Sequence, residues 1–332
     1  MSGLTVLYDE LRAYKRSRVL AFAVRSGILR SLELEPQTST SVANRVGYEG
    51  TWIQPVLNLL VELQLAECDN DQYRLTADGA TAKCDTTLDA FAGYHLHCFE
   101  AWLALPDVVS MKTGGGFHRQ RIQNSDFCRS YLKSMDVIAQ SNLDFLKGEC
   151  REHLLGRVLD LGAGPATLCR GLAEDGQLDV TAVDLTSVVE TARSLYGETE
   201  YFHWVPGDFP AWTPESPFDA VFCSHLLEYC SADRLDTWLK RVCEYLQPGG
   251  KAVFVTFLRS DDGQLQVELD MFELSTGVNG DSLGRCHTEQ ELSDALHRAG
   301  FVETRSRPFP TGPSYNEHLI VCEKPANKGS LS

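Results

Sequence analysis

The sequence predicts an α/β protein in two parts: a mainly helical winged-helix domain at the front and a doubly wound, mostly parallel sheet behind it. Three observations support the sheet. Short buried runs alternate with helical segments from residue 158 onward, and two further strands end the chain. A strand, a glycine turn and a helix follow one another between Arg157 and Glu174. Such a unit opens a doubly wound sheet, whose ligands bind at the carboxyl edge of the strands.

The composition disfavours several classes of protein. The chain has 332 residues and 43% are hydrophobic, so one large or two modest domains with full cores are expected. Its formal net charge of -16 disfavours nucleic-acid partners and anionic membrane surfaces, which both attract basic proteins. The 11 cysteines are scattered without any Cys-x-x-Cys, so we expect reduced thiols and no metal site. Without a signal peptide or a spanning apolar run, the sequence predicts a cytoplasmic location.

Residues 1-87 are predicted to form the winged helix. Residues 4-33 have helical periodicity, with a glycine as the C-terminal signal near the end. Thr and Ser side chains then cap a short helix, and a second amphipathic helix is expected near residues 53-65. Residues 66-68 and 72-76 flank an Asp/Asn-rich turn and predict a hairpin. The helix before this hairpin has few basic side chains, so we do not expect it to bind DNA.

Residues 88-150 are predicted to connect the two parts and to form part of a substrate pocket. The stretch 88-105 is rich in aromatic side chains, which fit either a packed helix or one wall of a pocket. The side chains expected on that wall are Phe91, Tyr94 and His95. Because His95 and His97 are two residues apart, they diverge on a helix and are not expected to bind a metal together.

Two more segments of this connector fit more than one role. Residues 112-117 contain three successive glycines, which indicate a hinge or a close backbone approach. Phe127, Tyr131 and Met135 fall four residues apart, on one face of a helix. A stripe of this kind either packs in a core or contacts a cofactor.

Residues 151-332 are predicted to form the ligand-binding domain. Strands are expected near residues 158-161, 180-184, 201-205, 218-223 and 251-257. Helices are expected near residues 166-174, 186-196, 232-246 and 288-299. The two final strands are expected at 302-307 and 318-323, joined by a Pro/Gly-rich loop at 308-313. Strands that alternate with helices in this way favour a parallel sheet.

The glycine turn after the first of these strands marks the expected ligand site. Gly162 and Gly164 let the backbone approach a ligand closely, because no Cβ stands in the way. A dinucleotide site is one interpretation, but Thr167 stands where its third glycine would be. Asp184 follows about 20 residues later, where nucleoside-binding folds place the acid that accepts hydrogen bonds from ribose. Asp208 follows the third strand at the same edge.

In these residues the chain resembles the class I S-adenosylmethionine-dependent methyltransferases. The matching segments are 159-164, 184, 207-209, 218-221 and 246-251. The front of the chain resembles the dimerisation domain of the small-molecule O-methyltransferases in segments 27-29, 59-63 and 73-76. The resemblance implies a Rossmann-like sheet that ends in an antiparallel strand pair, S-adenosylmethionine as the donor, a small-molecule acceptor of secondary metabolism, and a homodimer.

The resemblance also implies which residues bind the donor. Gly162 and Gly164 would pass beneath its methionine part, and Asp184 would hold the ribose. Asp208 and Phe209 would frame the adenine. The full set expected at the donor is Asp160, Gly162, Gly164, Asp184, Leu185, Gly207, Asp208, Phe209 and Ser224, with Tyr131 and Met135.

The residues expected to take the acceptor's proton depart from the family's pattern. In the resembled family a histidine after the fourth strand takes that proton and a carboxylate orients it. Here Glu228 stands in the place of the histidine, and Cys286 in the place of the carboxylate. Glu228 is the base if an apolar pocket raises its pKa, or His225 is the base. A third possibility is that the nucleophile needs no base, because it is acidic, already ionised, or a carbon or nitrogen atom.

O-methylation is therefore the favoured prediction, with C- or N-methylation as a further option. Two other functions remain as alternatives. The bound sulfonium could assist a reaction without methyl transfer, such as a decarboxylation, a hydroxylation or a pericyclic step, and then no S-adenosylhomocysteine would accumulate. A winged-helix regulator with a ligand-sensing domain is the third hypothesis, and the acidic charge of the chain counts against it.

Overall fold

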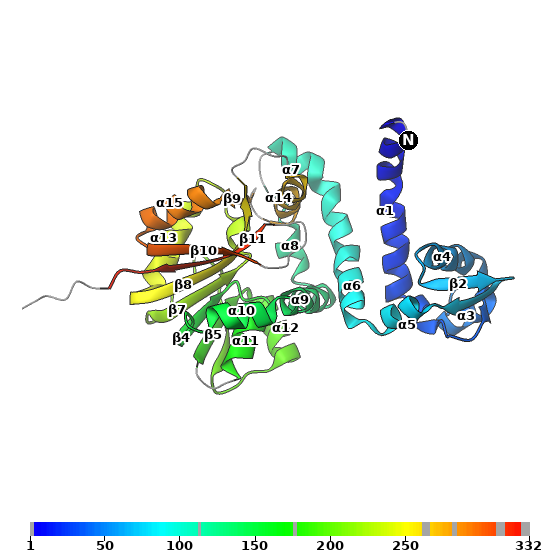
Figure 1. The fold of residues 1–332 in the computed structure, drawn as a ribbon, viewed down its shortest axis with the longest axis horizontal. Helices are drawn as coiled ribbons and strands as arrows, with labels where there is room; N and C mark the ends of the chain where they lie inside the picture. Colours follow the sequence, from blue (N-terminus) through cyan, green and yellow to red (C-terminus); the bar gives the residue numbers. More distant parts are fainter. Residues whose placement is uncertain are drawn as a thin grey trace, which may run out of the picture. The chain divides into compact units, whose positions relative to one another are not determined.

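The computed structural model describes residues 3-111, 114-174, 178-260, 266-280, 284-309 and 316-326. The chain divides into two compact units, Met1-Glu100 and Ala101-Ser332 (Figure 1). The expected boundaries after residues 87 and 150 stay a prediction. Residues 112-113 of the predicted glycine loop and 310-313 of the predicted Pro/Gly-rich loop lie outside the described residues.

The first unit is a winged helix. Its elements in chain order are α1 (Gly3-Arg25), α2 (Ile28-Ser31), β1 (Gln37-Thr38), α3 (Ser39-Val46), α4 (Gly50-Glu62), β2 (Ala66-Asp69), β3 (Gln72-Leu75), α5 (Ala77-Cys84) and α6 (Thr86-Ala101, as far as Glu100 in this unit). Strand β3 lies between β1 and β2 and pairs antiparallel with both. The predicted winged-helix class is confirmed.

Local chemistry explains where these elements begin and end. Helix α1 ends at Arg25 rather than near residue 33, because Gly27 takes a left-handed φ of 83° and separates it from the short α2. Thr38 caps α3 by accepting a hydrogen bond from the Ser41 N-H at 3.1 Å. Asn70 and Asp71 take φ values of 47° and 61°, as a tight hairpin between β2 and β3 requires.

The second unit carries the large sheet. Its elements before the sheet are η1 (Trp102-Ala104), α7 (Leu105-Met111), α8 (Phe117-Arg121), α9 (Ser125-Gln140) and α10 (Leu143-Cys150). The sheet and its helices follow as β4 (Gly156-Leu161), α11 (Thr167-Ala173), β5 (Leu178-Asp184), α12 (Thr186-Tyr196), β6 (Phe202-Pro206), β7 (Phe218-Ser224), η2 (Leu227-Tyr229), α13 (Leu235-Tyr245), β8 (Leu246-Arg259), α14 (Val267-Asn279), β9 (His287-Thr288), α15 (Glu289-Ala299), β10 (Val302-Pro308) and β11 (Glu317-Glu323).

The strands of this sheet run in the order β10-β11-β8-β7-β4-β5-β6, and β9 adds to the end of β8. Strands β4 to β8 are parallel, whereas β11 runs antiparallel between β8 and β10. The predicted Rossmann-like sheet with a final antiparallel pair is confirmed. From β4 the chain winds outward to β6 and then returns to β7 on the other side of β4. The crevice at this reversal is where doubly wound sheets bind ligands.

Both faces of the sheet are covered, which explains its continuous apolar runs. Helices α10, α11 and α12 cover one face, and α13 and α15 cover the other (Figure 1). Alternate strand residues point to opposite faces. One core contains Val158, Val180, Ala182, Ala220 and Val253. The other contains Leu159, Val183, Val221, Phe254 and Ile320.

Helix α14 packs against the loop that contains the three successive glycines. Helix α14 itself was not predicted. The C-terminal end of α14 contacts the glycine loop, because the N-H of Gly115 donates to the carbonyl of Gly277 at 2.9 Å. A Cβ on Gly115 would lie 2.5 Å from the carbonyl oxygen of Val278. Of the two roles predicted for this loop, a hinge or a close backbone approach, Gly115 shows the close approach.

Candidate active site

The glycine turn after β4 is anchored on one side and open on the other. The N-H groups of Gly162 and Ala163 both donate to the carbonyl of Val183, at 3.0 and 3.1 Å. A Cβ on Gly162 would come within 3.2 Å of the Leu226 side chain. At Gly164 it would meet no described heavy atom within 4 Å. Because both glycines have left-handed φ values, 68° and 51°, the turn presents bare backbone to the open side.

Asp184, at the end of β5, ties this turn to the next strand. Its Oδ2 accepts from the Gly164 N-H at 2.8 Å, and its Oδ1 accepts from the Leu185 N-H at 2.7 Å. The pKa of Asp184 is raised above its ordinary value, because the effect of burial exceeds that of the two hydrogen bonds, which lower it. A carboxylate has about four lone-pair positions, so each oxygen retains capacity for a further donor such as a ribose hydroxyl. The N-H of Gly207 donates to the Asp184 carbonyl at 2.8 Å and brings the end of β6 alongside.

Asp208, which follows β6, pairs with a residue that the sequence did not single out. Arg119 of α8 donates from Nη1 to Oδ2 at 2.9 Å and from Nη2 to Oδ1 at 3.2 Å. The next residue, Phe209, packs edge-on against Trp238 with 4.9 Å between ring centroids. Both predicted adenine-framing residues therefore lie at the carboxyl edge of the sheet. Arg119 was missed because a short helix 89 residues earlier carries no motif.

Asp160 lies in β4, directly before the turn, and its side chain is buried. Its Oδ2 has no hydrogen-bond partner among the described residues. Burial raises its pKa to about 8, while a hydrogen bond with the Cys169 thiol opposes the rise and the charge of Asp184 adds to it. Asp160 is thus a neutral acid near pH 7 with one unused oxygen.

The remaining residues expected at the donor lie on three elements. Leu185 precedes α12 and Ser224 ends β7; both are half-buried. Tyr131 and Met135 lie on α9, also half-buried. The Tyr131 ring lies 4.7 Å from the ring of His118 on α8, which the sequence did not single out. Their contact with a donor stays a prediction.

After β7 the chain places a histidine between two carboxylates. His225 Nδ1 lies 3.2 Å from Glu228 Oε1, and its Nε2 lies 3.0 Å from Glu317 Oε1. Burial lowers the pKa of His225, but hydrogen bonds to the two glutamates raise it to about 10. The imidazole is consequently protonated at neutral pH and uses both of its N-H groups. Glu317 was missed because one acid at the start of a strand gives no sequence signal.

Glu228 is a buried carboxylate, and its pKa does not have the raised value that one of the three alternatives for the base required. Burial would raise the pKa, but hydrogen bonds and the positive charge of His225 lower it, so the pKa is below the usual range. Its Oε1 also accepts from the Thr256 hydroxyl and the Phe257 N-H, both at 2.9 Å. Its backbone is covered as well, because a Cβ on Gly284 would lie 1.8 Å from the Glu228 carbonyl oxygen. Glu228 is therefore ionised and enclosed.

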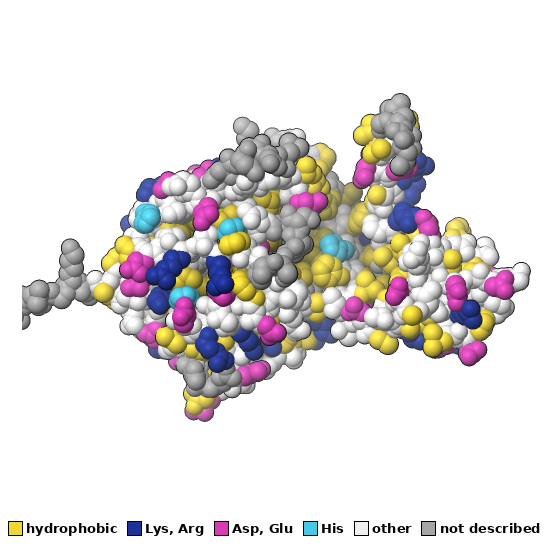
Figure 2. Space-filling view, viewed as in Figure 1, with side chains coloured by type: hydrophobic (Ala, Val, Ile, Leu, Met, Phe, Trp, Pro, Cys, Tyr) yellow, Lys and Arg dark blue, Asp and Glu magenta, His cyan; other side chains and the backbone are white. Residues whose placement is uncertain are grey.

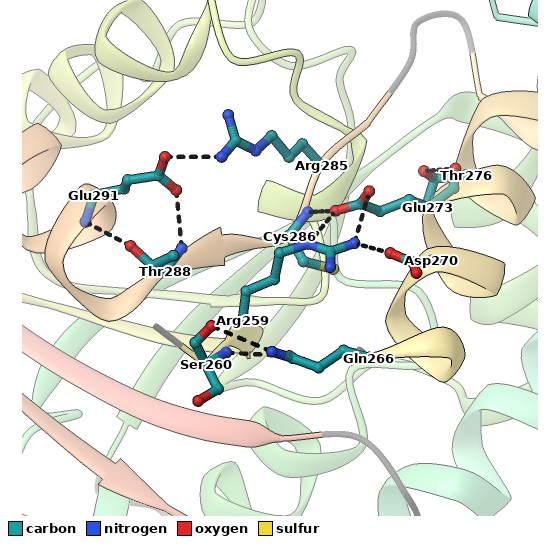
Figure 3. Close-up of polar contacts among 10 residues, drawn as sticks. All are labelled: Arg259, Ser260, Gln266, Asp270, Glu273, Thr276, Arg285, Cys286, Thr288 and Glu291. Atoms are coloured by element: carbon teal, nitrogen blue, oxygen red, sulfur yellow. Dashed lines mark hydrogen bonds and ion pairs between the residues drawn. The ribbon is translucent and has the colours of Figure 1, made fainter. Parts of the chain in front are cut away.

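Cys286, aligned with the carboxylate that orients the family's histidine, belongs to a separate polar network (Figure 3). Its N-H donates to Glu273 Oε1 of α14 at 2.8 Å. Arg259, at the end of β8, reaches Asp270 Oδ1 at 2.7 Å and Glu273 Oε2 at 3.0 Å. Burial raises the pKa of the Cys286 thiol, and the charge of Glu228 adds to the rise. The neutral thiol of Cys286 does not replace the missing carboxylate. The carboxylate of Glu273 lies nearby and accepts a hydrogen bond from the Cys286 N-H.

The residues expected on the substrate wall, Phe91, Tyr94 and His95, lie on α6 in the first unit. The His95 ring lies 5.5 Å from that of Phe91 and 5.4 Å from that of Tyr94. Burial lowers the pKa of His95, which keeps the imidazole neutral at pH 7. The side chain of His97 lies outside the described residues. The role of this wall in binding a substrate stays a prediction.

The amino-acid sequence is similar to one protein family and to individual methyltransferases. A family described as a methyltransferase domain matches residues 158-250. The chain is 24% identical over 329 residues to the tetracenomycin polyketide synthesis 8-O-methyl transferase TcmO of Streptomyces glaucescens, across 94% of each protein. It is also 24% identical over 336 residues to the N,N-dimethyltransferase OxyT of Streptomyces rimosus, again across 94% of each.

The fold has a solved counterpart over its full length. Human N-acetylserotonin methyltransferase in complex with SAM superposes with a TM-score of 0.80 and 18% sequence identity. The likeness covers 98% of this chain and 99% of that one. In the described parts of the present chain, no helix has both the length and the apolar character that crossing a membrane requires.

Proposed function

We propose that this chain, an S-adenosylmethionine-dependent methyltransferase, transfers a methyl group to a nucleophile on a small molecule of secondary metabolism. The methyltransferase domain over residues 158-250 and the similarity to two methyltransferases along 94% of the chain support the reaction class. The observation that carries the donor site is the glycine turn, open at Gly164 and tied through its N-H to Asp184. A ligand with a ribose fits this pairing of bare backbone and carboxylate.

The residues present fit the donor. When bound, S-adenosylmethionine supplies a methyl group already activated on a sulfonium. Gly162 and Gly164 would admit its methionine part against the backbone. The oxygens of Asp184 would accept hydrogen bonds from the ribose hydroxyls, and Asp208 with Phe209 would receive the adenine. The protein then has to hold the acceptor's nucleophile in line with the methyl group.

The class of acceptor atom is proposed from the two relatives of known reaction type. O-methylation stays the first assignment, and the similarity to TcmO, an 8-O-methyl transferase, supports it. The similarity to OxyT, an N,N-dimethyltransferase, supports a nitrogen acceptor in the same measure. A reaction without methyl transfer is the alternative function, and product analysis separates the two. Methyl transfer releases S-adenosylhomocysteine in step with the product, whereas an assisting donor would be recovered unchanged.

We also propose that the protein is a homodimer formed through its first unit. Helix α1 exposes apolar side chains between Val6 and Phe22, and Figure 2 shows hydrophobic side chains near the N-terminal end of this helix. Leu7, Leu11 and Tyr14 lie on one face at helical spacing, and each is at least 50% exposed. A stripe of this kind is typical of an interface. Leu11→Glu is expected to shift the mass measured by light scattering from dimer to monomer, whereas Asp9→Lys, on the opposite face of α1, should not.

Calorimetric titration tests the donor assignment. Wild-type protein should bind S-adenosylmethionine and S-adenosylhomocysteine with micromolar dissociation constants. Asp184→Ala should weaken both at least about tenfold, or about 1.4 kcal/mol. Asp179→Ala, at the opposite end of the same strand, is the matched control and should bind as wild type. Circular dichroism verifies that each variant is folded. Wild-type protein that binds neither nucleoside would refute the proposed function.

A further inference from the structure

The end of β7 holds a cluster that the expected chemistry does not use. His225 lies between Glu228 of η2 and Glu317 of β11, with its two ring nitrogens 3.2 and 3.0 Å from the two carboxylates. The Glu228 side chain is fully buried, and that of Glu317 is 11% exposed. The chain separates Glu317 from His225 by 92 residues. Only the antiparallel insertion of β11 beside β8 brings the two together.

The surroundings fix the imidazole in place. The Phe257 ring of β8 lies 4.6 Å from the His225 ring. The backbone of His225 has a φ of 50°, which a residue with a side chain rarely takes and which the fold imposes. Its N-H donates to the carbonyl of Val255 at 2.8 Å. The next residue, Leu226, packs its side chain against Gly162 of the donor turn. The cluster therefore adjoins the expected methyl donor.

We propose that Glu317 is a positioning residue which, together with Glu228, holds His225 as a doubly hydrogen-bonded cation and so removes it as a proton acceptor. A neutral imidazole has one N-H and one lone pair, and its lone pair would face a carboxylate. The protonated ring donates to both carboxylates, which stabilise its charge. The pKa of about 10 for His225 agrees with this geometry.

The other titratable groups near the cluster do not change this assignment. Cys223 and Cys286 lie close enough to feel the charge of Glu228, and burial raises the pKa of both thiols. His287 feels the same charge, but burial lowers its pKa first. These three groups are therefore neutral at pH 7, and within the described part of the chain the charges that face His225 are those of Glu228 and Glu317.

The inference narrows the acceptor, and in this respect it rests on the proposed function. With His225 already protonated, the acceptor must attack without giving its proton to that ring. An amine nitrogen with a free lone pair, a stabilised carbanion or a hydroxyl acidic enough to arrive ionised meets this requirement. An alcohol of ordinary acidity would need a base other than His225. Amines, enolates and acidic phenols are thus the classes to screen first.

Histidine titration by NMR tests the positioning role. Protein with ¹⁵N-labelled histidine rings is titrated from pH 5 to 10.5, and His225→Asn identifies the His225 signals. Asparagine tolerates the left-handed backbone, so this variant should fold. Glu317→Gln removes one charge with little change in size, and Glu323→Gln in the same strand is the matched control.

In the wild type and in Glu323→Gln, the His225 signals should remain those of a protonated ring up to about pH 9. In Glu317→Gln the midpoint should fall by at least one pH unit, because one stabilising charge is gone. A wild-type midpoint near 6.5, or a midpoint unmoved in Glu317→Gln, would overturn the proposal. A merely structural Glu317 would lower stability without moving this midpoint. If Glu317→Gln does not fold, the wild-type midpoint alone decides. The titration needs neither donor nor acceptor, so its result is independent of the calorimetric test.

Discussion

At the scale of single residues, the buried acid before the glycine turn has a consequence for stability. Asp160 has a pKa of about 8 in the folded chain, where burial disfavours its charge, against roughly 3.9 in an unfolded chain. Between these values the folded state retains a proton that the unfolded state releases. The free energy of unfolding therefore falls as the pH rises from about 4 to about 8.

Asp160→Asn is expected to remove this dependence, because the amide has a similar shape and no charge. At pH 4 the variant should unfold with nearly the wild-type free energy. At pH 8 it should be the more stable of the two by a few kcal/mol, since each whole step in pKa corresponds to about 1.4 kcal/mol. Urea unfolding at both pH values measures the difference. Asp179→Asn, exposed at the far end of β5, should follow the wild type, and equal curves for Asp160→Asn would contradict the assignment.

The two glycines at the strand ends predict different losses. A Cβ on Gly207 would lie 2.5 Å from the Trp212 ring and 2.7 Å from Val183, so Gly207→Ala should cost about 1-3 kcal/mol of stability. Gly164→Ala meets no described neighbour within 4 Å and strains only the backbone, at a cost of about 1-2 kcal/mol. Its methyl group would enter the open side of the turn, so donor binding should weaken strongly. Unfolding curves and calorimetry together distinguish these effects. If Gly164→Ala binds the donor as tightly as the wild type, the donor does not bind at this turn.

At the scale of elements, α15 shows how one hydroxyl fixes a helix start. Thr288 Oγ1 accepts from the Glu291 N-H at 3.2 Å, and Glu291 Oε2 accepts from the Thr288 N-H at 3.0 Å, as Figure 3 shows. This reciprocal pair is a capping box. It holds the N-terminus of α15 immediately after β9, beside the end of β8.

Thr288→Val should remove the cap and lower the free energy of unfolding by about 0.5-2 kcal/mol. Thr304 of β10 offers a matched control. Its hydroxyl is buried and makes no hydrogen bond among the described residues. Thr304→Val should therefore be neutral or stabilising. Denaturant unfolding of the two variants gives the comparison, and equal losses would mean that the hydroxyl of Thr288 does not act as a cap.

The elements that the sequence predicted share one property: their pattern is local. Helix α12 was predicted at 186-196 and spans Thr186-Tyr196. The strands from β4 to β7 were placed within two residues at each end, because each contains a short apolar run that the sequence shows directly. Helix α14 was missed because its apolar residues do not form one stripe. Val267 and Met271 are exposed while Leu269 and Val278 are buried.

At the scale of the whole molecule, the same distinction separates the predicted parts of the site from the others. Gly162, Asp184 and Asp208 were accessible to sequence reasoning because each lies at or just after the end of a strand, and parallel strands end at one edge. Arg119 and Glu317 come from distant segments, and only the tertiary fold gives them partners. The direction of the Glu228 pKa depends on such a distant partner as well, because the charge of His225 that lowers it is itself stabilised by Glu317.

The cluster around His225 also affects the stability of the entire chain at alkaline pH. The pKa of His225 is raised to about 10 from roughly 6.5 in an unfolded chain. The stability that it contributes is therefore fully present below about pH 6.5 and is lost as the pH rises through about 10. His225→Asn should flatten the free energy of unfolding between pH 7 and 10 relative to the wild type. Urea unfolding across this range measures it, and parallel curves would show that the ring gains no charge stabilisation from folding.

The position of β11 between β8 and β10 also bears on how the protein is made. Residues 317-323 are synthesised after both neighbouring strands, so β11 joins β8 last, either alone or as a hairpin with β10. Until then β8 has an unpaired edge, and β10 has no partner in the sheet. Such edges invite pairing with other chains, so the nascent protein is most exposed to aggregation just before synthesis of this strand. The addition of β11 pairs the free edge of β8 and places the second carboxylate, that of Glu317, beside His225.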